Sequence, residues 1–222
     1  MRSITMSRTL LSGALALGAL GAVAAFDVAP ATADPSPDVT MTVYDPVGDT
    51  LNNTKAEFQD VVRARLTKTA CGDFKLLMEM AVPIPAAPTL PSHGKSEIWW
   101  MWAFDLGSTP VPRGYPWQEA GSDNKFGRPA EFIVYVSWDG TTFAGTAIDR
   151  RPLLTGGEPI VTPVPFSIDG KIIEADLASA VIGEIPAGFG WGPYVGSWSG
   201  QVGTEAFHWA DYFEAGFAVF NP

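Results

Sequence analysis

Residues 74–82 read F-K-L-L-M-E-M-A-V, and the order of apolar and charged side chains in this stretch decides the fold class. Every second residue from Phe74 to Val82 is apolar, whereas Lys75 and Glu79 fall on the opposite face. A period of two residues is typical of a β-strand with one buried face. We therefore predict a half-buried strand here.

The segments on both sides of this strand extend the pattern. Residues 60–66 place Arg63 and Arg65 on one face, and the other face carries Val62, Ala64 and Leu66. The polar break at 67–72 predicts a hairpin between these two strands. Residues 97–106, E-I-W-W-M-W-A-F-D-L, are apolar on both faces, which is typical of a strand buried inside a sheet or between two sheets.

Two Asp-Gly pairs predict further hairpins, at Asp139-Gly140 and Asp169-Gly170. A tight type I′ turn needs positive φ angles, which glycine adopts without strain. Only residues 177–182 favour a turn or two of helix. The remaining strand-like segments are 39–43, 131–138, 141–148, 164–168, 171–175, 189–198, 206–212 and 217–220.

Strands at this spacing, separated by many of the 23 Gly and 19 Pro residues, predict an all-β fold. We expect an antiparallel two-sheet β-sandwich, jelly-roll-like, with very little helix. Two long loops interrupt it, at 83–95 and 107–129. Loops of this length in a compact domain are usually functional or disordered.

The first residues have the pattern of an export signal. Arg2 and Arg8 precede an apolar stretch from Leu10 to Phe26, and Ala31-Thr32-Ala33 supplies a small-x-small cleavage pattern. A membrane anchor is the alternative. The apolar run has about 17 residues, which is at the lower limit for spanning a bilayer.

We expect cleavage before Asp34, with an earlier cut near Ala24 as the second choice. The prediction is a cleavable secretory signal peptide over 1–33 and a single β-sandwich ligand-binding domain over 34–222. The protein is then secreted and extracellular, with no transmembrane segment in the mature chain, and we expect it to be a monomer.

Charge and cysteine content exclude several classes of function. The chain has 14 Lys and Arg against 24 Asp and Glu, a net charge of −10. This acidic balance is the opposite of the basic surface that binds phosphates, so we expect no nucleic-acid partner. Cys71 is the single cysteine, which excludes an intramolecular disulfide and a Cys-rich metal site.

A second motif, D-P-V-G-D at 45–49, combines carboxylates with turn-forming residues. Pro46 and Gly48 favour a tight turn that would bring Asp45 and Asp49 together, and Asp60 follows after a short spacer. Carboxylate oxygens are the ligands of Ca²⁺. We predict a structural calcium at these three aspartates, and turn capping without an ion is the alternative.

The order of the motifs carries a resemblance to a known family. It runs from D-P-V-G-D through Asp60-Val61-Val62, Phe104-Asp105, E-F-I-V-Y-V at 131–136, Phe166–Gly170, Phe189-Gly190-Trp191 and Ala210-Asp211-Tyr212. Over residues 40–213 this order resembles the secreted DOMON-like β-sandwich modules, which include family nine carbohydrate-binding modules. The resemblance implies a ligand-binding sandwich, often for a sugar and in some relatives for a haem, that is usually not catalytic.

Aromatic side chains in Gly- and Pro-rich segments are the candidates for sugar contacts, because flat rings stack on pyranose faces. The tryptophans of 97–106 are better explained as core residues. The candidate ligand-binding residues are Tyr115, Trp117, Trp191, Tyr194 and Trp198.

The sequence therefore predicts a non-catalytic module that binds a carbohydrate or another small extracellular ligand. The alternatives are a polysaccharide-acting hydrolase and a cell-surface interaction domain without a small ligand. A hydrolase would need paired carboxylates, for which the candidates are Glu97, Asp105, Glu131 and Asp149. Two histidines disfavour haem, although one axial His or Met would suffice to ligate it.

Overall fold

The computed structural model describes residues 37–50, 56–90, 97–107, 130–199, 206–212 and 218–221, all within the unit Pro35–Pro222. These residues form two antiparallel sheets with little helix, as the strand pattern predicted. The helical turns among them are η2 (Glu57–Gln59), η3 (Arg151–Thr155) and α2 (Ser179–Ile182). Within this part of the chain, no helix has the length and apolar composition needed to cross a bilayer.

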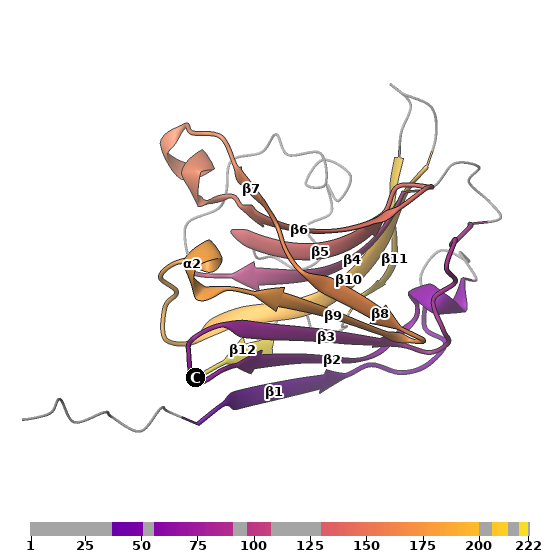
Figure 1. Cartoon of the computed structure of the whole chain (residues 1–222), viewed down its shortest axis with the longest axis horizontal. Helices are drawn as coiled ribbons and strands as arrows, with labels where there is room; N and C mark the ends of the chain where they lie inside the picture. The colour runs from indigo at the N-terminus through magenta and orange to yellow at the C-terminus, as the bar shows by residue number, and fades with distance from the viewer. Residues whose placement is uncertain are drawn as a thin grey trace, which may run out of the picture. The chain divides into compact units, whose positions relative to one another are not determined.

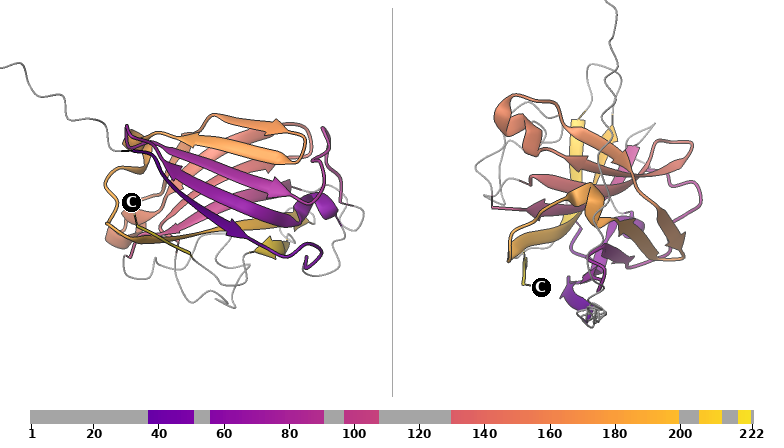
Figure 2. Two further views of the ribbon diagram at one scale, coloured as in Figure 1. Left: turned by 90° about the horizontal axis from the view of Figure 1, so that it is seen from below. Right: turned by 60° about the vertical axis from the view of Figure 1, so that its left-hand side comes forward.

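The two sheets form the layers of the sandwich (Figures 1 and 2). The five-stranded sheet has the order β1 (Val39–Tyr44), β2 (Val61–Lys68), β3 (Phe74–Met80), β9 (Ile172–Leu177), β8 (Phe166–Asp169). The seven-stranded sheet has the order β11 (Ala206–Tyr212), β10 (Phe189–Ser199), β4 (Glu97–Asp105), β5 (Phe132–Trp138), β6 (Phe143–Asp149), β7 (Ile160–Pro163), and β12 (Ala218–Phe220) pairs with β10.

The core lies between the sheets and is built from alternate residues of each strand. On β3 the predicted inner residues Phe74, Leu76, Met78 and Met80 are buried, and on β4 the buried inner row is Ile98, Trp100, Trp102 and Phe104. The indole N–H of Trp100 donates to the Phe58 carbonyl and that of Trp102 to the Leu77 carbonyl, each at 3.3 Å. The Trp102 bond reaches from one sheet to the other, and the Trp100 bond joins β4 to η2, which precedes β2.

Both Asp-Gly pairs lie at hairpins, but the turns differ from the two-residue Asp-Gly turn that we expected. Asp169 is the last residue of β8 and pairs with Ile172, so the connection is Gly170-Lys171. Between β5 and β6 the loop has four residues, 139–142. Asp139 Oδ1 accepts hydrogen bonds from the N–H groups of Thr141 and Thr142, which favours this longer loop over the tight turn.

Two further details depart from the sequence pattern. A β-bulge between Val61 and Arg63 puts Val61 in the core, whereas Val62, which we expected there, is only half-buried. The second is β7, which the pattern did not predict. It is an edge strand that ends at Pro163 and exposes Ile160 and Val161, so it lacks a buried apolar face.

The first long loop packs back onto the sandwich where it is described. Ile84 and Leu90 are buried, and Ile84 donates its N–H to the Gly170 carbonyl. Residues 91–95 and 108–129 lie outside the described residues.

Glu79 joins three parts of the five-stranded sheet through its carboxylate. It contacts Arg63 of β2 and Lys171 of the β8–β9 turn, each at 2.6 Å. The Lys171 ammonium, aided by Arg63, lowers the pKa of Glu79 although burial opposes this. The ionised carboxylate therefore stabilises the fold.

We predict that Glu79→Gln lowers the free energy of unfolding by about 1 kcal/mol near neutral pH, because two partly exposed ion pairs are weakened. A lowered native pKa stabilises the fold above the unfolded pKa, and this stabilisation is lost as pH falls through the native pKa. The difference between wild type and variant should therefore disappear in acid, as measured by urea unfolding across pH. Asp176→Asn, which removes the exposed pair with Lys75, is the control and should have less effect.

A second prediction concerns Gly145 on β6, which lies against the segment that connects β7 to β8. A Cβ there would collide with the Val164 carbonyl and lie 2.8 Å from Phe166 Cδ1. Gly145→Ala should destabilise the protein by about 1–3 kcal/mol through overpacking. Gly157→Ala, with its nearest contacts at 3.3 Å, should cost less. Equal melting temperatures for the two variants would contradict the close approach.

Candidate functional site

The D-P-V-G-D segment forms the predicted turn directly after β1. Asp45 donates its N–H to the Val62 carbonyl of β2 at 3.2 Å. Gly48 has a φ of +89°, a conformation that favours glycine, and its N–H donates to Asp60 Oδ2 at 2.8 Å. The turn is therefore fastened to the residue just before β2.

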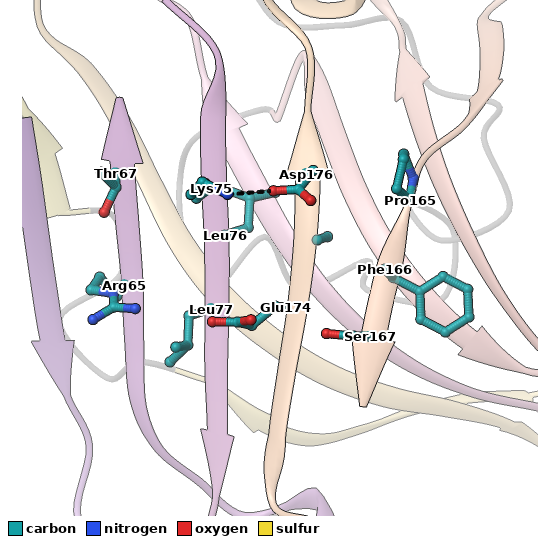
Figure 3. Close-up of a pocket in the computed structure, with 11 residues that line it drawn as sticks. Arg65, Thr67, Lys75, Leu76, Leu77, Pro165, Phe166, Ser167, Glu174 and Asp176 are labelled. Atoms are coloured by element: carbon teal, nitrogen blue, oxygen red, sulfur yellow. Dashed lines mark hydrogen bonds and ion pairs between the residues drawn. The ribbon is translucent and has the colours of Figure 1, made fainter. Parts of the chain in front are cut away.

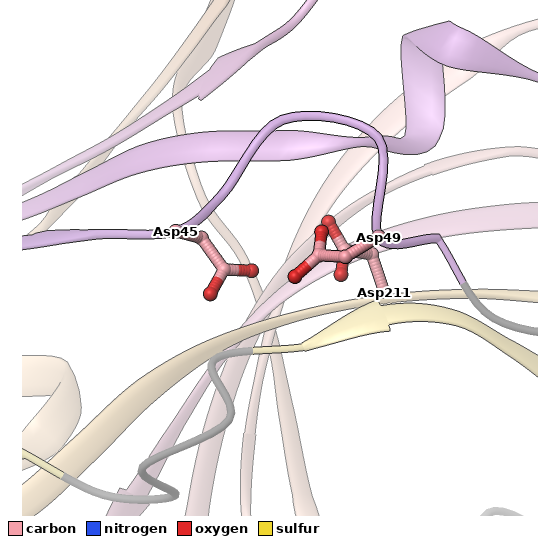
Figure 4. Close-up of side chains that lie close together, drawn as sticks. All are labelled: Asp45, Asp49 and Asp211. Atoms are coloured by element: carbon pink, nitrogen blue, oxygen red, sulfur yellow. The ribbon is translucent and has the colours of Figure 1, made fainter.

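Three carboxylates meet at this turn, contributed by Asp45, Asp49 and Asp211 (Figure 4). One oxygen from each lies within 4.8 Å of the others. Asp45 and Asp49 follow β1 of the five-stranded sheet, whereas Asp211 lies on β11 of the seven-stranded sheet. The cluster thus joins the two layers.

Asp211 belongs to β11 and is hydrogen-bonded to the first residue of β2. Asp211 is only 2% exposed, and its Oδ2 accepts a hydrogen bond from the Val61 N–H at 2.5 Å. Val61 begins β2, directly after Asp60. One carboxylate of β11 therefore reaches the start of a strand in the opposite sheet.

Asp60 adds a fourth acidic group beside the cluster. It is 3% exposed, and among the described residues Oδ1 has no hydrogen-bond partner. Burial raises the pKa of Asp60, the Gly48 N–H opposes this, and the charges of Asp49 and Glu57 raise it further. Asp49 Oδ1 is likewise buried without a hydrogen-bond partner in the described ranges. Negative charge is concentrated here at low exposure.

Such an arrangement suits a hard cation. Ca²⁺ takes 6–8 oxygen ligands from carboxylates, carbonyls and water, in flexible geometries. Asp45, Asp49 and Asp211 would supply carboxylate oxygens, and a divalent charge would offset their mutual repulsion. Asp60 would hold the turn through Gly48 and add to the negative potential.

The sequence placed Asp45, Asp49 and Asp60 at one site. The structure brings the first two together with Asp211 and puts Asp60 beneath the turn, bonded to Gly48. Asp211 was missed as a candidate ligand. It lies in the strand-like run 206–212 and in the Ala210-Asp211-Tyr212 motif, and nothing local relates it to a turn more than 150 residues earlier.

The aromatic candidates fall into two groups. Trp191 is fully buried between the sheets, where its indole N–H donates to Met41 Sδ at 3.4 Å, and Tyr194 is 4% exposed. In this conformation the ring of Trp191 is enclosed in the core, and little of Tyr194 is exposed. Trp198 pairs with Glu97 on β4, but its side chain lies outside the described part of the structure, as do Tyr115 and Trp117 altogether.

The carboxylates considered for hydrolysis mostly have partners that explain them. Asp105 Oδ1 accepts from the Gly107 N–H at 3.0 Å, and Glu131 Oε2 accepts from the Leu106 N–H at 2.7 Å. Asp149 forms an ion pair with Arg151 at 2.7 Å. Burial raises the pKa of Glu97, but a single such group does not make an acid–base pair.

Comparisons of the chain with family models, with curated proteins and with solved structures gave no match.

We predict that Asp49→Asn has opposite effects with and without calcium. In excess chelator the variant should be more stable by about 1 kcal/mol, because one of several like charges a few ångströms apart is removed. In calcium the wild type should gain stability, about 2.7 kcal/mol at a concentration 100 times the dissociation constant, and the variant much less. Thermal melts in calcium and in chelator measure both effects.

Asp169→Asn is the matched control, since this exposed residue lies at the β8–β9 turn and takes no part in the cluster. It should keep the full calcium response of the wild type. An identical melting temperature of the wild type in calcium and in chelator would show that the aspartates cap a turn and hold no ion.

Proposed function

We propose that this protein is an exported, non-catalytic β-sandwich module that binds a carbohydrate or another small extracellular ligand, with a structural calcium at Asp45, Asp49 and Asp211. It leaves the cell by a cleavable signal peptide over 1–33 and acts as a monomer.

The observation that carries the proposal is the convergence of three carboxylates, from the turn after β1 and from β11, at one partly buried point. A chain with a single cysteine has no intramolecular disulfide to tie its layers together. A calcium ion bound between β1 and β11 would supply that tie. Extracellular modules bind calcium at about 10⁻⁴–10⁻³ M, so the ion would be retained outside the cell.

The second line of support is the way in which the acidic residues are used. Asp105, Glu131 and Asp149 accept hydrogen bonds from the backbone or form an ion pair with Arg151. These bonds hold strand ends in place, which explains the carboxylates without a catalytic role. The motif order that resembles DOMON-like modules favours sugar binding, and for this reason we place the hydrolase and the ligand-free interaction domain second.

The test is a glycan array probed with the purified protein in calcium and again in chelator. We expect binding to at least one class of glycan in calcium and weaker binding in chelator, because loss of the ion loosens the fold. Polysaccharides incubated with the protein should release no reducing sugar. Absence of binding to every glycan, or release of reducing sugar, would overturn the proposed function.

A further inference from the structure

The outer face of the five-stranded sheet contains a pocket away from the aspartate cluster. It has a volume of about 180 Å³ and lies over β2, β3, β9 and β8 (Figure 3). Pockets for drug-sized ligands measure about 300–1,000 Å³, so this one fits a single small unit. Its polar lining includes Arg65, Thr67, Lys75, Ser167, Glu174 and Asp176.

Strand register explains why these side chains meet. Arg65 of β2 lies opposite Leu77 of β3, and Leu77 lies opposite Glu174 of β9. The three residues form one row across the sheet, with the side chains on the same outer face. Adjacent strands are about 4.8 Å apart, so Arg65 and Glu174 stand roughly 10 Å apart across Leu77.

In this row an apolar side chain lies between two charged side chains that have no partner within the described part of the fold. Leu77 is 6% exposed and lies at the centre. In the next row Lys75 and Asp176 form an ion pair at 3.2 Å. By contrast, among the described residues the side chains of Arg65 and Glu174 form no hydrogen bond or ion pair. A donor fork and a carboxylate acceptor thus flank the small part of Leu77 that is open to the pocket.

The charges of the pocket favour a neutral ligand. Arg65 and Lys75 balance Glu174 and Asp176, so the lining has no net charge to attract an anion or a cation. Thr67 and Ser167 add hydroxyl groups that can donate or accept. A sugar ring matches this lining, because its hydroxyls pair with both donors and acceptors while its C–H face packs on an apolar side chain.

We propose that this pocket binds one neutral sugar unit of a glycan, with Arg65 donating to ring hydroxyls, Glu174 accepting from others and Leu77 beneath the ring. The inference rests on the proposed function and names the surface and ligand chemistry. The proposed contact surface is thus the outer face of the five-stranded sheet and not the segments that carry the aromatic candidates.

The experiment measures dissociation constants by calorimetry for the neutral glycan that binds best on the array. The variants are Arg65→Lys, which keeps the charge and loses the planar fork, and Glu174→Gln, with Glu158→Gln as the matched control on an exposed residue outside the pocket. Each pocket variant should bind roughly tenfold more weakly, because Arg65→Lys loses the paired donors of the guanidinium and Glu174→Gln loses the charge of the acceptor. The control should bind like wild type, and thermal melts should show all variants folded.

The outcomes separate this inference from the proposed function. If the wild type binds glycans and both pocket variants bind equally well, the pocket is not the site, although the proposed function stands. If the wild type binds no glycan, the proposed function fails and the pocket assignment with it. A panel of free amino acids and dipeptides is titrated in parallel, and binding of these in place of glycans, lost in the same variants, would overturn the sugar assignment.

Discussion

Three tryptophan N–H groups in the interior of the sandwich constrain how its two layers fit together. Trp100 and Trp102 of β4 and Trp191 of β10 are fully buried. Their partners are the Phe58 carbonyl of η2, which precedes β2, and the Leu77 carbonyl and Met41 Sδ of the five-stranded sheet. An indole N–H left unpaired in the core would cost about 1–3 kcal/mol. Sliding one sheet against the other would break the bonds to Leu77 and Met41. The two layers are therefore held in one position, which also fixes where their outer surfaces lie.

The strands could be predicted because their signal is local. The alternation in β3 and the two-sided apolar pattern of β4 need no knowledge of the partner strand. β7 escaped prediction because an edge strand with Pro163 and exposed Ile160 and Val161 lacks the burial that produces alternation. The Asp-Gly pairs located hairpins correctly, but a side-chain contact of Asp139 decided the loop length.

The candidate site shows the same division between local and tertiary information. Asp45 and Asp49 belong to one turn motif and could be paired from the sequence. Asp211 joins them only because β11 pairs with β10. No local sequence pattern reveals the register of this pairing. Trp191 was misplaced among exposed aromatics for a related reason. Its pairing with Phe104 assigns it to the inner face of β10, although the Gly- and Pro-rich composition of this strand-like segment suggested an exposed ring.

Because β3 pairs with β9 and β4 pairs with β10, the sheets cannot be completed until late in synthesis. During synthesis from the N-terminus, β2, β3 and β4 emerge long before the strands that complete their sheets, and the Val61–Asp211 bond closes over 150 residues. Until then, apolar strands with open edges are exposed to other chains, a state prone to aggregation. The nascent protein therefore depends on being kept apart from its neighbours until its final strands arrive, and a chain shortened at its C-terminus would remain in that vulnerable state.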